Sequence, residues 1–177
     1  MPIVKLGDEG RWTNYHGTGT CEAATRFALR SGDAPRGRDE IAIAAKSVQD
    51  WLTQAAAAQR RVRPLGAGWS PSNVNISSQS WLLHTRRFNR CFRIGADDVR
   101  PGIDANALML VEAGALVDEV SDKFEEQGRS LWTSGAGNGQ TFAGAAATGT
   151  HGSMIARGGI QDHIRAVQIV TPAGIHW

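Results

Sequence analysis

Two glycine-rich segments hold the residues of this sequence whose types and spacing could do chemistry. The first follows a short apolar run, as Pro64-Leu65-Gly66-Ala67-Gly68-Trp69-Ser70-Pro71-Ser72. Glycines here let the main chain turn and expose successive N–H groups, and a concave row of such donors binds phosphate oxygens. The alternative is a plain turn after a strand. The segment is not a Walker A loop, because no Gly-Lys-Ser/Thr follows, and it lacks the third glycine of the Rossmann fingerprint.

The second segment, residues 134–153, contains six glycines and five alanines among polar residues. A tight crossing of small residues would explain Gly144 and the alanines. It would not explain the interleaved polar side chains, which are Asn138, Gln140, Thr141, Thr148, Thr150, His151 and Ser153. A polar segment of small residues that can form little core is better explained as a wall around a large polar ligand.

The elements that must position these segments predict an α+β fold. Asp39 is expected to cap a helix that runs to about Ala58, because the apolar residues from Ile41 to Ala55 recur at helical spacing. Further helices are expected at 116–127 and 143–147, and strands at 62–65, 80–84, 91–94, 108–113, 131–132 and 164–171. The apolar residues of segment 1–37 show little periodicity, which predicts an irregular N-terminal arm. We expect two lobes, residues 1–100 and residues 101–177.

Composition and charge exclude several classes of function. The net charge of +2, with both signs interspersed, gives no reason to expect a nucleic-acid partner. Cys21 and Cys91 lack metal-ligand spacing and are too few for a disulfide framework, so they predict free thiols in a reducing compartment. No secretory signal and no apolar run of membrane-spanning length is visible. We therefore expect a cytoplasmic protein without a membrane partner.

The two segments together resemble a known family. Gly66-Ala67-Gly68-Trp69-Ser70, followed about eighty residues later by Thr148-Gly149-Thr150-His151-Gly152-Ser153, is similar to the vanillyl-alcohol-oxidase-type (PCMH-type) flavoproteins. Within them the sugar-lactone and alditol oxidase branch is most similar. The opening Trp12-Thr13-Asn14-Tyr15-His16-Gly17 resembles that branch's N-terminal arm, and Glu112-Ala113-Gly114 resembles its strand end. The resemblance covers nearly the whole chain.

The resemblance implies that FAD lies between two α+β lobes. The pyrophosphate would lie on backbone N–H groups of Gly66 to Ser70, and the second segment would line the flavin and its ribityl chain. The cofactor-binding residues expected in this way are Gly66, Ala67, Gly68, Trp69, Ser70, Gly135, Ala136, Thr141, Gly144, Thr148, Gly149, Thr150 and His151. Many family members carry a histidine, covalently bound to the flavin, where this sequence has Trp69. Indole cannot form that bond, so we expect non-covalent FAD.

Family members also continue past the strand equivalent to residues 164–171, into a cap domain that holds most of the substrate pocket. We therefore expect a second polypeptide or a C-terminal fragment to supply the cap, with a small-molecule substrate. No catalytic residue can be named. His84, His151 and His163 are general-base candidates by chemistry alone, and a structural role is the alternative for each.

The activity that the resemblance implies is oxidation of an alcohol, polyol or sugar lactone by an FAD-dependent oxidase. Gly135 aligns with the place that stands over the reactive edge of the flavin, where glycine leaves a path for O₂; a simple turn is the alternative. Two other functions stay open. One is a stand-alone FAD-binding subunit that needs a partner chain, and the other is a non-catalytic relic.

Overall fold

A long antiparallel hairpin opens the chain. The computed structural model describes residues 2–32, 38–75 and 77–177. Strands β1 (Ile3–Thr13) and β2 (Thr20–Arg30) pair along their whole length, with one register shift between Lys5 and Gly7. The expectation of an irregular arm is therefore wrong. The inward positions of β2 include Cys21, Ala23 and Thr25, whose small side chains conceal the alternation of buried and exposed residues.

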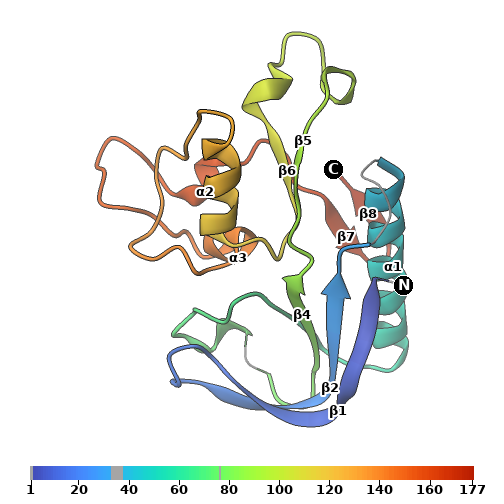
Figure 1. The fold of residues 1–177 in the computed structure, drawn as a ribbon. Helices are drawn as coiled ribbons and strands as arrows, with labels where there is room; N and C mark the ends of the chain where they lie inside the picture. Colours follow the sequence, from blue (N-terminus) through green and yellow to red (C-terminus); the bar gives the residue numbers. More distant parts are fainter. Residues whose placement is uncertain (1, 33–37, 76) are drawn as a thin grey trace.

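The hairpin belongs to a four-stranded sheet in the order β1-β2-β4-β3 (Figure 1). Strands β3 (Val62–Leu65) and β4 (Trp81–Arg87) confirm the strands expected there, and both run parallel to β2. Helix α1 (Arg38–Ala57) joins β2 to β3, as a parallel crossover requires. Asp39 falls inside the first turn of α1 and not at its cap, and its side chain lies outside the described residues.

The main core lies between α1 and this sheet. Trp51 of α1 contacts Phe27 of β2 and Trp81 of β4, with ring centroids 5.1 and 5.9 Å apart. Leu29 and Leu83 complete the buried cluster. Aromatic rings bury large apolar areas, and edge or tilted packing adds a favourable electrostatic contribution. The core therefore fixes the strand that leads into the first glycine segment.

A second group of elements follows. Strands β5 (Cys91–Arg93) and β6 (Met109–Val111) form an antiparallel pair, and helices α2 (Val117–Glu125) and α3 (Phe142–Ala147) lie together beyond it. Val117, Ala145 and Ile160 form their core. Short 3₁₀ turns lie at Asn73–Asn75, Ala96–Asp98, Ala105–Ala107 and Ile160–His163. The mixed α+β class is thereby confirmed, while the division at residue 100 stays a prediction.

The C-terminal part differs from expectation in two places. Residues 131–132 form no strand; Leu131 packs on the α2–α3 core and the Trp132 ring stacks on His163, with centroids 4.4 Å apart. The strand expected at 164–171 is reduced to β7 (Ile169–Thr171), which pairs with β8 (Gly174–His176). Alternating apolar and polar residues form a strand only where another strand pairs with them, and residues 164–168 pair with no described strand. Most of these residues are exposed. The β7–β8 hairpin lies against α1 (Figure 1).

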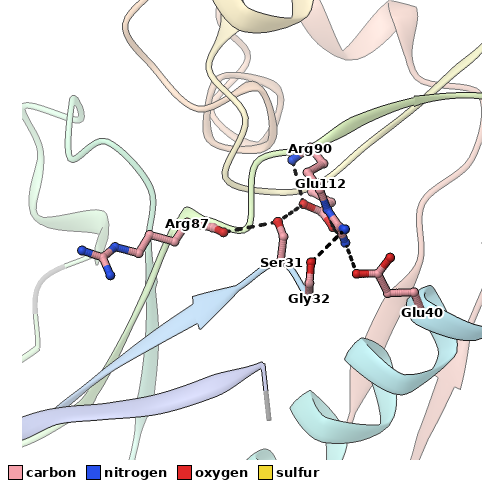
Figure 2. Close-up of polar contacts among 6 residues, drawn as sticks. All are labelled: Ser31, Gly32, Glu40, Arg87, Arg90 and Glu112. Carbon is pink, nitrogen blue, oxygen red and sulfur yellow. Dashed lines mark hydrogen bonds and ion pairs between the residues drawn. The ribbon is translucent and has the colours of Figure 1, made fainter. Parts of the chain in front are cut away.

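A buried ion-pair network ties the two groups of elements together (Figure 2). Glu112, after β6, accepts hydrogen bonds from Ser31 Oγ (2.5 Å), from the Arg90 backbone N–H (2.7 Å) and from Arg90 Nη2 (2.9 Å). Arg90 Nη2 also donates to Glu40 of α1 at 2.5 Å, and Nη1 donates to the Gly32 carbonyl at 3.1 Å. Burial alone would lower the pKa of Arg90, but the hydrogen bonds and charges of the two carboxylates outweigh it and raise the pKa.

Candidate cofactor site

The first glycine segment leaves β3 at a fixed point. Leu65 is buried, and its carbonyl accepts a hydrogen bond from Thr85 Oγ1 of β4 at 3.1 Å. Gly68 has a φ of +73°, in the left-handed region that favours glycine. Within the described residues, no hydrogen bond uses the backbone N–H groups of Ala67, Gly68, Trp69 or Ser70. The turn therefore presents four consecutive donors without protein acceptors.

The second segment is tied to the start of α2. The N–H groups of Val117 and Asp118 donate to the carbonyls of Gln140 (2.9 Å) and Asn138 (3.2 Å). Thr141 then caps α3, because its hydroxyl accepts from the Gly144 N–H at 3.3 Å. In the described part of the chain, no hydrogen bond uses the N–H groups of residues 135–140. A second row of free donors thus precedes α3.

The structure brings the two segments into direct contact. A Cβ added at Gly66 would overlap Thr141 Oγ1 and lie 2.9 Å from Thr141 Cγ2. Cβ atoms at Gly137 and Gly139 would lie 2.9 and 2.6 Å from the ring of Trp69. Distances below 3.0 Å do not occur between real Cβ atoms and their neighbours, so each of these glycines allows a close approach. The two segments, which are far apart in the sequence, therefore lie side by side at these contacts, and their joint role in cofactor binding stays a prediction.

The rest of the second segment folds back on its own beginning. A Cβ at Gly135 would lie 2.7 Å from Thr150 Cγ2, and one at Gly152 would lie 2.6 Å from the Ser134 carbonyl oxygen. The Thr148 hydroxyl donates to the Gly144 carbonyl at 3.0 Å, within α3 and its cap. Residues 149, 151, 153–155, 157 and 158 are exposed and line an open pocket of about 540 Å³ with their neighbours.

The expected cofactor-binding residues fall into three classes of exposure. Thr141 is buried. Gly66, Ala67, Gly68, Trp69, Ser70, Gly135 and Thr150 are half-buried, and Ala136, Gly144, Thr148, Gly149 and His151 are exposed. Within the half-buried group, Gly66 and Trp69 lie at the contact between the two segments, while Gly135 and Thr150 lie close to each other within the second segment. The exposed group lies on α3, in the adjoining loops and beside the open pocket.

Tyr15 lies at the candidate site but was not among the cofactor-binding residues expected from the sequence. The ring of Tyr15, in the turn between β1 and β2, stacks on Trp69 with centroids 4.6 Å apart and an interplanar angle of 9°. His16 meets the same indole edge-on at 6.2 Å. The sequence feature that could have indicated this role is the Trp12–Gly17 motif, which combines polar and aromatic residues in a segment expected to be irregular. This turn forms one side of the candidate site.

The three histidines do not gather at this contact. Burial, and then the charge of Arg26, lower the pKa of His84, whose Nε2 is buried without a described partner. Burial also lowers the pKa of His163, which stacks on Trp132. His151 is exposed, with Nδ1 3.0 Å from the Gly152 carbonyl oxygen. His84 pairs with Leu65 across the β3–β4 register and is thus nearest to the first segment.

The described residues fit a flavin dinucleotide. A pyrophosphate can be bound by successive backbone N–H groups, and those of residues 67–70 have no acceptor in the part of the chain that the structure describes. Gln140 adds a buried Oε1 that has no hydrogen-bond partner in the described part of the chain, an acceptor suited to a ribityl hydroxyl. Residues 66–70 and 135–140 would hold the cofactor in this arrangement.

Metal and membrane sites find no support in the parts of the chain that the structure describes. Residues 2–32, 38–75 and 77–177 contain no group of three or more metal-binding side chains. The helices of these same ranges are too short or too polar to cross a bilayer. Cys21 and Cys91 are both free thiols, as expected, and burial raises the pKa of Cys91 to about 11.

Comparison with known proteins decides the family. Residues 43–177 match the family described as FAD binding domain, which is well over half of the chain. The chain belongs to this family of FAD binding domains. The matched range includes both glycine segments and leaves the β1–β2 hairpin outside.

The relatives of this FAD binding domain confirm its resemblance to the lactone-oxidase branch. It is 30% identical to the L-gulonolactone oxidase of Scyliorhinus torazame over 115 residues, which is 65% of this chain and 24% of the relative. It is 27% identical to the D-arabinono-1,4-lactone oxidase of Debaryomyces hansenii over 145 residues, 79% of this chain and 25% of the relative. The chain thus spans about a quarter of the length of these relatives.

Solved structures show the same fold at low identity. An alkyldihydroxyacetonephosphate synthase matches with a TM-score of 0.66 and 17% identity, over 88% of this chain and 28% of that one. The cholesterol oxidase of B. sterolicum matches with a TM-score of 0.60 and 13% identity, over 85% and 25% of the two chains. At this low identity, the two structures show a shared fold and indicate nothing about function.

Proposed function

We propose that this chain is the FAD-binding portion of a flavin-dependent oxidase that acts on an alcohol, polyol or sugar lactone. The observation that carries the proposal is the contact between two glycine segments, in which the N–H groups of residues 67–70 and 135–140 have no acceptor among the described residues. The substrate class rests on relatives named as lactone oxidases. Bound FAD would accept the hydride of the substrate alcohol, and the chain would bind and orient the cofactor.

Each segment has its own part in this arrangement. The N–H groups of Gly66 to Ser70 would neutralise the pyrophosphate through oriented dipoles, as a backbone anion site does. The 135–140 loop would border the ribityl chain and flavin, with Gln140 Oε1 accepting from a hydroxyl. Thr141 would hold the two segments in register, because it both contacts Gly66 and caps α3. A further part of the protein or a partner chain would supply the substrate pocket.

The spectrum of the purified chain tests cofactor binding directly. Bound flavin adds visible absorption bands, and titration of the apoprotein with FAD should quench flavin fluorescence to saturation. A stand-alone FAD-binding subunit would bind FAD but turn over an alcohol only after a partner chain is added. A relic would bind no FAD, and that outcome would refute the proposed function.

Bound FAD is expected to be non-covalent. Trp69 offers only an indole N–H, which is a donor and a poor nucleophile. Acid precipitation of the FAD-loaded chain should leave the yellow colour in the supernatant. The Trp69→His variant, treated in the same way, is the matched comparison, since it restores a nucleophilic ring nitrogen. Colour retained in the wild-type pellet contradicts the expectation.

Reduced flavin is expected to react quickly with O₂ in this site. Gly135 leaves space toward Thr150, and an added methyl at this position would have to push into Thr150 Cγ2. In a close-packed interior one methyl group can close a narrow path to a small apolar molecule. Stopped-flow reoxidation should therefore slow about tenfold or more in Gly135→Ala, a barrier increase of about 1.4 kcal/mol or more.

The control for this comparison is the double variant Gly135→Ala/Thr150→Ser, which removes the opposing methyl and should recover part of the rate. Equal rates in the wild-type and Gly135→Ala proteins would assign Gly135 to a turn only. Slow reoxidation in all three proteins would point to an electron acceptor other than O₂.

A further inference from the structure

The turn between β1 and β2 is bonded to the first glycine segment along most of that segment's length. We call residues 14–19 the hairpin turn. The Tyr15 N–H donates to the Gly68 carbonyl at 2.9 Å, Asn14 Nδ2 donates to the Ser70 carbonyl at 2.9 Å, and Thr18 Oγ1 donates to the Pro71 carbonyl at 2.9 Å. Figure 1 shows the hairpin turn, in blue, beside the green segment that follows β3. Three carbonyls of the glycine segment therefore face the hairpin turn.

These bonds decide where the free donors of the segment point. The described peptide bonds are all trans, and in a trans peptide the C=O and the following N–H point in opposite directions. Holding the Gly68 carbonyl toward the hairpin turn aims the Trp69 N–H away from it. Holding the Pro71 carbonyl does the same for the Ser72 N–H, which also has no acceptor among the described residues. The hairpin turn thus sets the direction of the donor row.

Asn14 is the residue that joins the two turns. Its residue surface is 4% exposed, and both ends of its amide are used. Oδ1 accepts from the Gly19 N–H at 3.1 Å, while Nδ2 donates to Thr18 Oγ1 and to Ser70 O, both at 2.9 Å. The Asn14 N–H donates to the Gly19 carbonyl at 3.0 Å and closes the loop. A buried and fully bonded amide holds its neighbours in one arrangement.

We propose that Asn14 is a positioning residue for phosphate recognition: by holding the hairpin turn in place, it keeps the N–H groups of Trp69 and Ser72 aimed at the pyrophosphate of FAD. This proposal rests on the proposed function and adds a structural part that lies outside the family match at 43–177. The hairpin turn extends the cofactor site to the first twenty residues. Asn14 itself touches no cofactor in this arrangement. Its bond to the Ser70 carbonyl anchors the segment but aims no donor, because Pro71 has no N–H. Asn14 acts through the hairpin turn, since it bonds Thr18, whose hydroxyl holds the Pro71 carbonyl, and precedes Tyr15, whose N–H holds the Gly68 carbonyl.

A purely structural role for the hairpin turn makes a different prediction. Tyr15 stacks on Trp69, so loss of the turn could also loosen the flavin side of the site. Loss of general packing should weaken every flavin ligand. Loss of donor orientation should weaken only ligands that carry phosphate. FAD and riboflavin share the flavin ring and differ in the phosphates and adenosine, so the pair separates the two roles.

The experiment compares FAD and riboflavin binding by isothermal titration in four versions of the full chain. Asn14→Ala removes the central amide. Thr18→Val removes the bond to the Pro71 carbonyl and the acceptor of one Asn14 hydrogen bond, but leaves the bond from Asn14 to the Ser70 carbonyl. Thr13→Ala is the matched control, because it deletes the Thr13–Thr20 hydroxyl pair (3.0 Å) of the same hairpin without reaching the glycine segment. Near-UV circular dichroism records whether each variant is folded.

We expect the Kd of FAD to rise about tenfold in Asn14→Ala and about threefold in Thr18→Val, as for loss of hydrogen bonds that hold a ligand-binding group. The Kd of riboflavin should change less than about twofold in both, and Thr13→Ala should match the wild type for both ligands. If Asn14→Ala does not fold, Thr18→Val gives the same comparison.

Four results would overturn the proposal. An equal loss of FAD and riboflavin affinity, or unchanged FAD affinity in both variants, would show that Asn14 only supports packing. A wild-type chain that binds riboflavin as tightly as FAD would show that phosphate is not recognised at all, and a chain that binds neither would remove the proposed function together with this inference. The wild-type titrations thus separate the two failures.

Discussion

Replacing Arg90 with methionine is expected to lower the free energy of unfolding by about 3–5 kcal/mol. Arg90 is the shared cation of two buried carboxylates, since the side chains of Glu112 and Glu40 are 4% and 10% exposed. Without it, both carboxylates lose the guanidinium group that they share in Figure 2. A domain of this size has a total stability of about 5–15 kcal/mol, so the loss is a large share of it.

Urea unfolding followed by tryptophan fluorescence measures this effect. Lys46→Met is the matched control: its partner Asp50 is 2.7 Å away, but the side chains are 63% and 53% exposed. An exposed pair of this kind contributes about 0–1 kcal/mol, so the control should unfold close to the wild type. Equal effects of the two substitutions would contradict the role of Arg90 as the half-buried cation that compensates two buried carboxylates.

A second comparison separates charge from packing. The triple variant Arg90→Met/Glu112→Gln/Glu40→Gln removes the buried charges together, and replacing a whole buried ion-pair set is often nearly neutral. It should therefore be more stable than Arg90→Met alone. If the triple variant is less stable, the network contributes through its hydrogen bonds to Ser31 and Gly32 and not through charge compensation.

Replacing Gly66 with alanine is expected to raise the Kd of FAD about tenfold or more. The added methyl would overlap Thr141 Oγ1 and must push Thr141 away from the first segment. Overpacking of this kind costs about 1–3 kcal/mol. Because Thr141 also caps α3, its displacement would move both rows of donors relative to each other. Flavin fluorescence titration measures the affinity.

The double variant Gly66→Ala/Thr141→Ala is the decisive control for this clash. Thr141→Ala removes the two side-chain atoms nearest to the added methyl, and on its own it deletes only the cap of α3. The two effects should therefore be non-additive, with the double variant binding FAD better than Gly66→Ala. Additive losses would mean that Gly66 contacts the cofactor independently of Thr141.

Strong local patterns predicted most of the elements correctly. The helical period of residues 41–55 gave α1, and the amphipathic run after Gly114 gave α2. The β1–β2 hairpin was missed because its buried face is made largely of small residues such as Ala23 and Cys21, which carry little hydrophobic contrast. The strand expected at 164–171 was too long because periodicity does not reveal whether a partner strand is present.

By itself the sequence determined the two glycine segments, the indole at position 69 and the family that they resemble, because these depend on residue types and on order along the chain. The tertiary structure decided what the glycines are for. Gly66 makes room for Thr141, and Gly137 and Gly139 make room for Trp69, so part of the space first assigned to a ligand belongs to the protein. A missing Cβ looks the same in a sequence whether a side chain or a cofactor fills its place. Only contacts between distant residues, such as Thr141 beside Gly66 and Trp69 beside Gly139, show which of the two fills it.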